Sequence, residues 1–321
     1  MRALVTGAAG FVGSHLAERL AGEGHEVRAV DCVSSFSDTS QKLANLATLG
    51  DLLGCEVVRA DLLDFDLETL LAGVDTVFHQ AGQPGVRSSW GRGLGSYVEN
   101  NVLATHRLLE AVRWSRGVRR FVYASSSSVY GNTATYPTSE DELPRPHSPY
   151  GVTKLAAEHL CGVYARNFDV PTVSLRYFSV YGPRQRPDMA FHRLIEAALS
   201  SRPFPLFGDG LQVRDFTSVD DVVEANLLAA SRPVPPGSVC NIAGGSSTSL
   251  LNVVDLVEEL VGSPIELERR ESQPGDVGRT EGAIHQAAEL LGWRPRVMLR
   301  EGLARQVSWH IARRVSAGST Q

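Results

Sequence analysis

The residues of this 321-residue sequence with the strongest catalytic pattern are Tyr150 and Lys154, which are four positions apart. On a helix that spacing places both side chains on one face. A free tyrosine has a pKa of about 10 and is a poor base at neutral pH, whereas a nearby ammonium group favours the phenolate. Lys154 is one of two lysines among 31 basic residues, and arginine would not replace its compact ammonium well. The pair therefore predicts a general base, with a surface helical pair as the alternative.

A run of four serines, Ser125–Ser128, follows a predicted strand at Arg120–Ala124. Hydroxyl groups stand here where aliphatic side chains would pack better. In open parallel sheets, ligands bind outside the carboxyl ends of the strands. A polar strand terminus accounts for Ser125 but not for the whole run. We therefore expect this run to lie beside a bound ligand.

A glycine-rich turn, Gly7-Ala-Ala-Gly10-Phe-Val-Gly13, lies between a predicted strand and a predicted helix. Glycines there permit a tight turn and let backbone N–H groups approach a pyrophosphate. Since the chain has 30 glycines, the motif alone is weak. Asp31, however, stands 18 residues after Gly13, where a ribose-binding acid is expected. An acid there would repel a 2′-phosphate, so the pattern favours NAD over NADP, with a structural turn and a solvated Asp as the alternative. Asp61-Leu62 either meets the adenine or ends a loop.

These motifs belong to an alternation of short apolar runs and amphipathic stretches in the first half of the chain. The alternation predicts βαβ units and a parallel sheet whose strands are buried on both faces. The predicted strands are Ala3–Val5, Glu26–Val30, Cys55–Arg59, Thr76–His79, Arg120–Ala124 and Thr172–Tyr177. The predicted helices are Phe11–Ala21, Phe65–Leu71, Ser96–Ser115 and Tyr150–Asn167.

After Tyr177 the regular alternation of apolar runs and amphipathic stretches ends, which indicates a second and smaller lobe. We expect an α/β fold with a doubly wound parallel sheet of the Rossmann type in residues 1–177, to which 216–243 return. A mixed α/β C-terminal lobe would comprise 178–215 and 244–321, with a cleft between the two lobes. Residues 313–321 are expected to form a frayed tail.

Composition and charge exclude several classes of protein. A net charge of −5 argues against a protein that binds mainly to nucleic acid or to anionic lipid. No apolar run approaches the roughly 18 residues that cross a bilayer, and the strand beginning by Ala3 leaves no room for a signal peptide. The four cysteines lack metal or redox spacing, so no metal site is expected. We expect a cytoplasmic protein without membrane or nucleic-acid partners.

Together, these residues resemble the extended short-chain dehydrogenase/reductase family, and the resemblance covers most of the chain. In the first half it rests on the glycine loop, Asp31, Asp61, His79, Asn101, the serine run and the Tyr150/Lys154 pair. In the second half it rests on Arg176-Tyr-Phe-Ser-Val-Tyr-Gly-Pro183, Arg214-Asp215-Phe216 and Pro274-Gly-Asp276.

The resemblance implies a bound NAD and a catalytic trio of Tyr150, Lys154 and Ser126, while Asn101 is expected to be structural. The residues that would hold NAD are Gly7, Gly10, Phe11, Val12, Gly13, Asp31, Asp61, Leu62, Gln80, Ala81, Tyr150, Lys154 and Tyr177.

Family members that act on nucleotide sugars use the segments of the second half for substrate. The resemblance therefore implies a UDP-sugar, with Arg214 at the diphosphate, Asp276 at the nucleoside ribose and Phe207 in the segment that packs on the uracil. Gly85-Val-Arg87 adds Arg87 to this predicted substrate site.

The branch of the family is indicated by the residues that follow Ser126. Related dehydratases and decarboxylases carry additional acids where this chain has Ser127 and Ser128, so epimerisation is favoured. The serine run and the segment Tyr181-Gly-Pro-Arg-Gln-Arg186 are similar to those of bacterial UDP-glucuronate 4-epimerases. That similarity implies that Arg186 faces the substrate carboxylate, assisted by Ser127, Ser128 and Ser179.

The function expected from the resemblance is NAD-dependent 4-epimerisation of UDP-glucuronate to UDP-galacturonate through a transient 4-keto sugar. The alternatives are a UDP-glucose/UDP-galactose 4-epimerase, a UDP-glucuronate decarboxylase and a non-catalytic dinucleotide-sensing protein. The helices predicted at Ser96–Ser115 and Tyr150–Asn167 form homodimer interfaces in many relatives, so a homodimer is expected.

Overall fold

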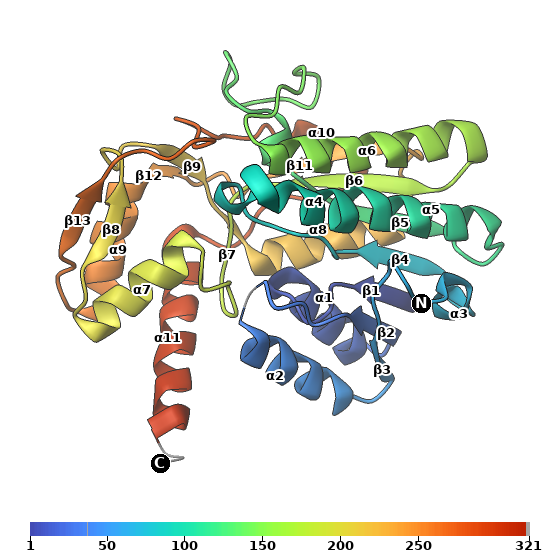
Figure 1. The fold of residues 1–321 in the computed structure, drawn as a ribbon, viewed down its shortest axis with the longest axis horizontal. Helices are drawn as coiled ribbons and strands as arrows, with labels where there is room; N and C mark the ends of the chain where they lie inside the picture. The colour runs from blue at the N-terminus through green and yellow to red at the C-terminus, as the bar shows by residue number, and fades with distance from the viewer. Residues whose placement is uncertain (37, 319–321) are drawn as a thin grey trace.

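A parallel seven-stranded sheet forms the centre of the computed structural model, which describes residues 1–36 and 38–318 (Figure 1). The strand order is β11-β6-β5-β4-β1-β2-β3, so the direction of winding reverses between β1 and β4. The strands are β1 (Arg2–Thr6), β2 (Glu26–Asp31), β3 (Cys55–Arg59), β4 (Thr76–His79), β5 (Arg120–Ser126), β6 (Thr172–Tyr177) and β11 (Ser238–Ile242). The doubly wound α/β fold predicted from the sequence is confirmed. In such sheets, ligands bind where the strand order reverses.

Helices cover both faces of this sheet, as the apolar strands require. On one face pack α1 (Phe11–Gly22), α2 (Thr39–Gly50), α8 (Val219–Ser231) and α10 (His285–Leu291). On the other pack α3 (Leu67–Leu71), α5 (Ala104–Trp114) and α6 (Pro149–Phe168). Both faces are visible in Figure 1, with α5 and α6 side by side and α1 and α2 opposite them.

Two helical regions differ from the sequence prediction. Helix α2 was not predicted, because few apolar side chains mark its buried face; its start is set by Asp38, whose carboxylate accepts hydrogen bonds from the N–H groups of Ser40 and Gln41. The helix predicted at Ser96–Ser115 is interrupted. It consists of α4 (Leu94–Tyr97), a wider π-helical segment η3 (Val98–Leu103) and α5.

A second lobe follows β6 and has its own apolar core. Its helices α7 (Ala190–Ser200), α9 (Leu250–Val261) and α11 (Leu299–Gly318) pack together through side chains such as Phe191, Val253 and Leu303. Two small two-stranded sheets belong to it: β8 (Phe204–Phe207) with β13 (Leu267–Arg270), and β9 (Val213–Asp215) with β12 (Ser247–Ser249). A third two-stranded sheet pairs β7 (Val180–Tyr181) with β10 (Thr217–Ser218). Single helical turns lie at η1 (Arg87–Ser89), η2 (Gly91–Gly93) and η4 (Ser127–Val129).

The C-terminal segment is more ordered than the sequence suggested. The prediction of a frayed tail from Arg313 is wrong up to Gly318, because α11 continues to that residue and is tied down by ion pairs from Arg313 to Asp38 and from Arg314 to Glu196. The rest of the predicted tail, residues 319–321, lies outside the described residues. Within residues 1–36 and 38–318, no helix combines the length and apolarity that a membrane crossing needs.

Candidate active site

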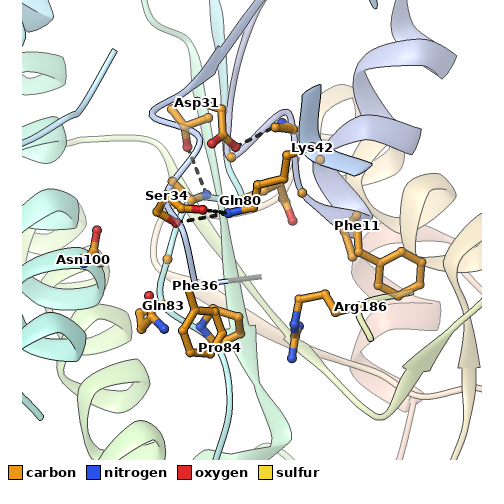
Figure 2. Close-up of a pocket in the computed structure, with 18 of the residues that line it drawn as sticks. Phe11, Asp31, Ser34, Phe36, Lys42, Gln80, Gln83, Pro84, Asn100 and Arg186 are labelled. Atoms are coloured by element: carbon orange, nitrogen blue, oxygen red, sulfur yellow. Dashed lines mark hydrogen bonds between the residues drawn. The ribbon is translucent and has the colours of Figure 1, made fainter. Parts of the chain in front are cut away.

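A cavity opens at the carboxyl edge of the sheet, beside the point where the strand order reverses (Figure 2). Its wall contains every residue that the sequence predicted to hold the cofactor, from the glycine loop to Tyr177. Figure 2 shows Asp31 at one end of this pocket and Arg186, which comes from the second lobe, at another. The cavity therefore lies between the two lobes.

The glycine loop forms a cradle that only glycines permit. Gly7 has a φ of 70°, and a Cβ there would lie 2.7 Å from the backbone nitrogen of Ala81. A Cβ on Gly13 would lie 2.1 Å from the carbonyl oxygen of Gly7. Helix α1 starts at this loop, and among the described residues no side chain caps it. The N–H groups of its first turn are thus available to an anion, which fits the diphosphate of a dinucleotide.

Asp31 ends β2 and faces the same cavity, and its carboxylate also holds the loop together. It accepts hydrogen bonds from the N–H groups of Ala9 (3.1 Å) and Val33 (2.7 Å). Lys42 of α2 lines this end as well and donates to the carbonyl (2.8 Å) and hydroxyl (3.1 Å) oxygens of Ser34. Lys42 was not predicted as a site residue because α2 was not predicted, although Lys42 is one of only two lysines in the sequence.

The residues predicted to carry the chemistry meet where β5 ends and α6 begins. The hydroxyl of Ser148 caps α6 by accepting from the N–H of Gly151 (3.1 Å), which places Tyr150 in the first turn and Lys154 one turn later. Both side chains line the cavity. Ser126 stands at the end of β5, 8% exposed, and its side chain is hydrogen-bonded to that of Tyr150.

Burial dominates the protonation of this group. It raises the pKa of Tyr150, while the hydrogen bond from Ser126 and the charge of Arg186 act in the opposite direction. Burial also lowers the pKa of Lys154 to about 8. Lys154 Nζ lies 4.5 Å from the centre of the Tyr123 ring, and the charges that act on the pKa of Tyr150 are those of Arg186 and Tyr97. Burial is thus the largest effect on the pKa of Tyr150 in this structure, and the expectation that Lys154 favours the Tyr150 phenolate stays a prediction.

Two further residues of the predicted pattern, Asn101 and His79, hold elements around the site together by hydrogen bonds. Asn101, in η3, accepts from the N–H of Gln83 (2.6 Å) and donates to the hydroxyl of Thr153 (3.0 Å) on α6. His79 is fully buried, hydrogen-bonded to Thr6 and Thr105, and burial lowers its pKa to about 3. The hydrogen bonds of both side chains thus connect separate secondary-structure elements.

The residues predicted for the nucleotide end of the substrate gather in the second lobe beside η1. Arg87 forms an ion pair with Asp276 (2.9 Å) and stacks over the ring of Phe207 at 4.2 Å. Arg214 donates to the carbonyl of Val277 (2.6 Å), and the charge of Asp276 raises its pKa while burial, the larger effect, lowers it. Four side chains from four separate segments thus meet at one place.

The residues predicted for the substrate carboxylate are only partly brought together. Arg186 lines the cavity, and its charge reaches Tyr150, yet it is paired with Asp188 through two contacts of 3.0 Å. Ser127 and Ser128 lie half-buried in η4, and Ser179 lies half-buried before β7. These three serines stand outside the wall of the described cavity.

Comparison with known proteins relates the chain to nucleotide-sugar enzymes. Residues 3–243 match the model of the NAD dependent epimerase/dehydratase family. A crystal structure of the Bacillus cereus UDP-glucuronic acid 4-epimerase with UDP-glucuronic acid and NAD is similar, with a TM-score of 0.94, 42% identity and coverage of 97% of this chain and 99% of that one.

Two curated relatives align over almost their whole lengths. An uncharacterized UDP-glucose epimerase of Bacillus subtilis is 44% identical over 96% of this chain and 98% of its own. A UDP-glucuronate 4-epimerase of Thermodesulfobacterium geofontis is 35% identical over 95% of each. The relatives thus carry names that include both a uronate and a neutral sugar.

Proposed function

The chain belongs to the NAD dependent epimerase/dehydratase family, and from this we propose that it converts UDP-glucuronate to UDP-galacturonate with NAD as its resident cofactor. The observation that carries the proposal is the shared cavity: the glycine cradle, Tyr150 and Arg186 all line it. A cofactor site, a proton-transferring phenol and a cation for the sugar carboxylate therefore stand within one space.

The cradle and the strand ends hold NAD. The N–H groups at the start of α1 bind its diphosphate, and Asp31, with carboxylate oxygens left to accept, binds ribose hydroxyls. When bound, NAD takes up the hydride of the sugar C4 and returns it to the opposite face.

Tyr150 and Ser126 act on the oxygen at C4. Tyr150 removes the proton of the 4-hydroxyl and later returns one, while the Ser126 hydroxyl hydrogen-bonds the same oxygen. Because burial raises the pKa of Tyr150, the phenolate needs a positive charge nearby. Lys154, which also lines the cavity, supplies this positive charge. Neutral pH is below its pKa of about 8, so its side chain is an ammonium group there.

The carboxylate of the substrate calls for its own restraint. The 4-keto uronate is a β-keto acid, which loses carbon dioxide when its carboxylate stands perpendicular to the ketone plane. Arg186 keeps N–H groups free of Asp188 and donates them to this carboxylate. Ser127, Ser128 and Ser179 restrain its rotation by further hydrogen bonds.

The UDP end stays bound while the sugar turns over. Arg214 contacts the diphosphate, Asp276 the ribose, and Phe207 packs on the uracil. We assign these residues to a nucleotide-sugar lobe of residues 178–215 and 244–321, apart from α10, which packs on the central sheet. The described cluster of Arg87, Phe207 and Asp276 supports this, because it combines a cation, a ring and a hydrogen-bond acceptor.

Product analysis tests the proposal against its rivals. Purified protein is incubated separately with UDP-glucuronate and UDP-glucose, and the nucleotide sugars are separated and identified by mass. We expect UDP-galacturonate as the main product and much slower turnover of UDP-glucose. Faster turnover of UDP-glucose would support the neutral-sugar epimerase, a UDP-pentose product would support the decarboxylase, and no product despite bound NAD would support a dinucleotide sensor.

We also propose that the face of α5 and α6 forms a homodimer. Large apolar side chains remain exposed along η3, α5 and α6: Leu103 (46%), Trp114 (72%), Val152 (52%), Val163 (39%) and Phe168 (41%). These helices pack beside each other on one face of the sheet (Figure 1). A second copy of the same face would bury this apolar strip.

Light scattering of the purified protein tests the dimer. Val152→Asp should convert a dimer to a monomer. Leu53→Asp is the control, because Leu53 is 97% exposed outside this face, between α2 and β3. A wild-type monomer, or dissociation by both variants, would contradict the proposed interface.

A further inference from the structure

The turn directly before Arg186, residues 182–185, is held in a strained backbone conformation. Residues 182–185 connect β7 to the segment before α7, and the N–H of Gln185 donates to the carbonyl of Gly182 (3.2 Å). Pro183 and Arg184 occupy the centre of the turn, and Arg184 has a φ of 63°. That left-handed conformation is unfavourable for a residue with a side chain, so it persists only where the surroundings impose it.

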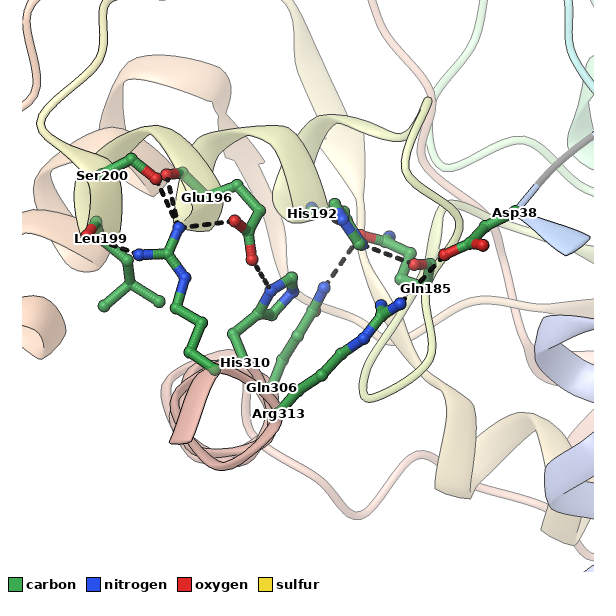
Figure 3. A network of polar contacts seen from close by, with 10 residues as sticks. Asp38, Gln185, His192, Glu196, Leu199, Ser200, Gln306, His310 and Arg313 are labelled. Atoms are coloured by element: carbon green, nitrogen blue, oxygen red, sulfur yellow. Dashed lines mark hydrogen bonds and ion pairs between the residues drawn. The ribbon is translucent and has the colours of Figure 1, made fainter. Parts of the chain in front are cut away.

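Two buried glutamines impose it (Figure 3). Gln185 is 4% exposed, and its Oε1 accepts from the backbone N–H of His192 (2.9 Å) and from Nε2 of Gln306 (3.0 Å). Its Nε2 donates to the carbonyl of Val180 (3.0 Å). Gln306, on α11, is fully buried, and its Oε1 accepts from the N–H of Gly182 (3.0 Å). One amide of α11 therefore binds both the first and the last residue of the turn.

The two arginines of this segment reach in different directions. Arg184 points to α1, where it pairs with Glu18 (2.7 Å) and contacts the Ser14 hydroxyl (3.4 Å). Arg186 lines the cavity near Tyr150. The conformation of the turn thus decides where the Arg186 guanidinium lies relative to the reacting sugar.

We propose that Gln306 is a positioning residue that, by holding the turn, sets Arg186 against the substrate carboxylate and so determines the preference for a uronate over a neutral sugar. This inference rests on the proposed function. Gln306 is not part of the cavity wall. It acts through Gln185 and Gly182, from a helix more than a hundred positions later in the chain.

Separate contacts attach α11 to its neighbours, so Gln306 is not needed merely to dock this helix. His310 donates from Nδ1 to Glu196 on α7 (2.6 Å), and Arg314 binds the other oxygen of Glu196 (2.6 Å). His192, Glu196 and His310 have ligand atoms within 4.8 Å of one another. Both Glu196 oxygens thus accept hydrogen bonds from α11, so Glu196 anchors this helix to α7.

Two substitutions of Gln306 test the two hydrogen bonds of its side-chain amide. Gln306→Met removes both hydrogen bonds while keeping a side chain of similar length. Gln306→Glu keeps the acceptor for Gly182 N–H but places a carboxylate oxygen against Gln185 Oε1. Val307→Ala is the control: Val307 is the next residue of α11, 4% exposed, and packs in the apolar core of the second lobe.

The measurements are kcat and KM for UDP-glucuronate and UDP-glucose, dissociation constants for both sugars and for UDP by calorimetry, and the melting temperature. We expect Gln306→Met to lower the ratio of kcat/KM values, uronate over neutral sugar, by about tenfold, the effect of one charge-assisted contact. Its KM for UDP-glucuronate should rise while kcat for UDP-glucose and the affinity for UDP stay unchanged. Gln306→Glu should have a smaller effect in the same direction. Val307→Ala should lower the melting temperature but leave the ratio unchanged.

The outcomes separate the inference from the proposed function. If Gln306→Met lowers the melting temperature as Val307→Ala does and leaves the ratio unchanged, the positioning role is wrong while the proposed function stands. If Gln306→Met does not fold, Gln306→Glu decides by the same ratio. If the wild-type protein converts no UDP-glucuronate, the proposed function is wrong, and the ratio of the two sugar dissociation constants still shows whether Gln306 acts on the carboxylate.

Discussion

The part of the site that we propose to hold NAD, the cofactor half, and the part that we propose to hold the nucleotide sugar, the substrate half, would recognise their ligands by different means. The cofactor half uses backbone N–H groups at the start of α1, in a stretch of seven residues from Gly7 to Gly13. The substrate half uses side-chain charges from distant segments, and in this structure those charges are paired with each other, Arg87 with Asp276 and Arg186 with Asp188.

The difference determines what each half must do when a ligand arrives. The cradle of glycines is already shaped, so binding costs little rearrangement. Under the proposed function, the substrate half would exchange these protein ion pairs for contacts with the nucleotide sugar. Such partly exposed pairs are weak, so the exchange is easy and depends on salt. We therefore expect substitutions in the cofactor half to act as all-or-none changes and those in the substrate half as graded changes in specificity.

The largest effect should come from Tyr150→Phe, at the junction of the two halves. Removing the phenolic oxygen removes the proton transfer, so kcat should fall by about a thousandfold while bound NAD is retained. The rate of product formation gives kcat, and the nucleotide released on denaturation gives the amount of bound NAD. Tyr123→Phe is the control, because that hydroxyl has no hydrogen-bond partner among the described residues. Turnover like that of the wild type in Tyr150→Phe would remove this residue from the mechanism.

Gly13→Ala tests whether the cradle is as rigid as its contacts indicate. The new Cβ would lie 2.1 Å from the carbonyl of Gly7, so NAD content should drop by about ten- to a hundredfold, or the lobe should unfold more easily. Gly22→Ala, at the other end of α1, meets nothing within 4 Å and serves as the control. Equal NAD content in both variants would contradict the rigid cradle and weaken the contrast between the halves.

Arg186→Ala should show the graded behaviour of the substrate half. Loss of a charge-assisted contact should lower kcat/KM for UDP-glucuronate by about ten- to a hundredfold and change UDP-glucose turnover far less. Steady-state kinetics with both substrates provide the measurement, and Arg184→Ala is a comparison variant whose side chain points to α1. Equal losses with both sugars would mean that the carboxylate is bound elsewhere.

Lys154 provides a pH test, because it is a buried charge without an ion-pair partner among the described residues. Its pKa is lowered to about 8 from 10.5, so folding is penalised below about pH 8, where both states carry the proton. As pH rises from about 8 to 10.5, the unfolded state binds more protons than the folded state, and the penalty is relieved. Lys154→Met should therefore be more stable than the wild type at pH 7, by a margin that shrinks over this range. Denaturant unfolding at several pH values would show a constant margin if the pKa were ordinary.

The smallest effect is expected for Arg87→Met. The ion pair with Asp276 is partly exposed, so the free energy of unfolding should change by less than about 1 kcal/mol, and less at high salt. UDP affinity should fall more clearly, since Arg87 also stacks on Phe207. Calorimetry with UDP and chemical denaturation separate the two, and a large loss of stability with unchanged UDP affinity would make the pair structural.

Patterns of short range were predictable from the sequence. The strands and the glycine turn follow from local hydrophobicity and conformational freedom, and the four-residue spacing of Tyr150 and Lys154 places them on one face of α6. Helix α2 escaped prediction because its buried face is narrow, and the π-helical turn around Asn101 interrupts a helix that the apolar pattern shows as continuous. The pKa of Tyr150 was also beyond reach, since it depends on burial in the folded chain.

Local sequence patterns were enough to predict the central sheet, the glycine cradle and helix α6, because turns and helices bring neighbours in the chain together at fixed spacings. The hydrogen bond of Gln306 to the turn before Arg186, and the ion pair of Arg87 with Asp276, 189 positions away, could be found only in the folded structure. Contacts of that kind have no characteristic spacing. They arise only when folding of the whole chain brings the second lobe against the edge of the sheet.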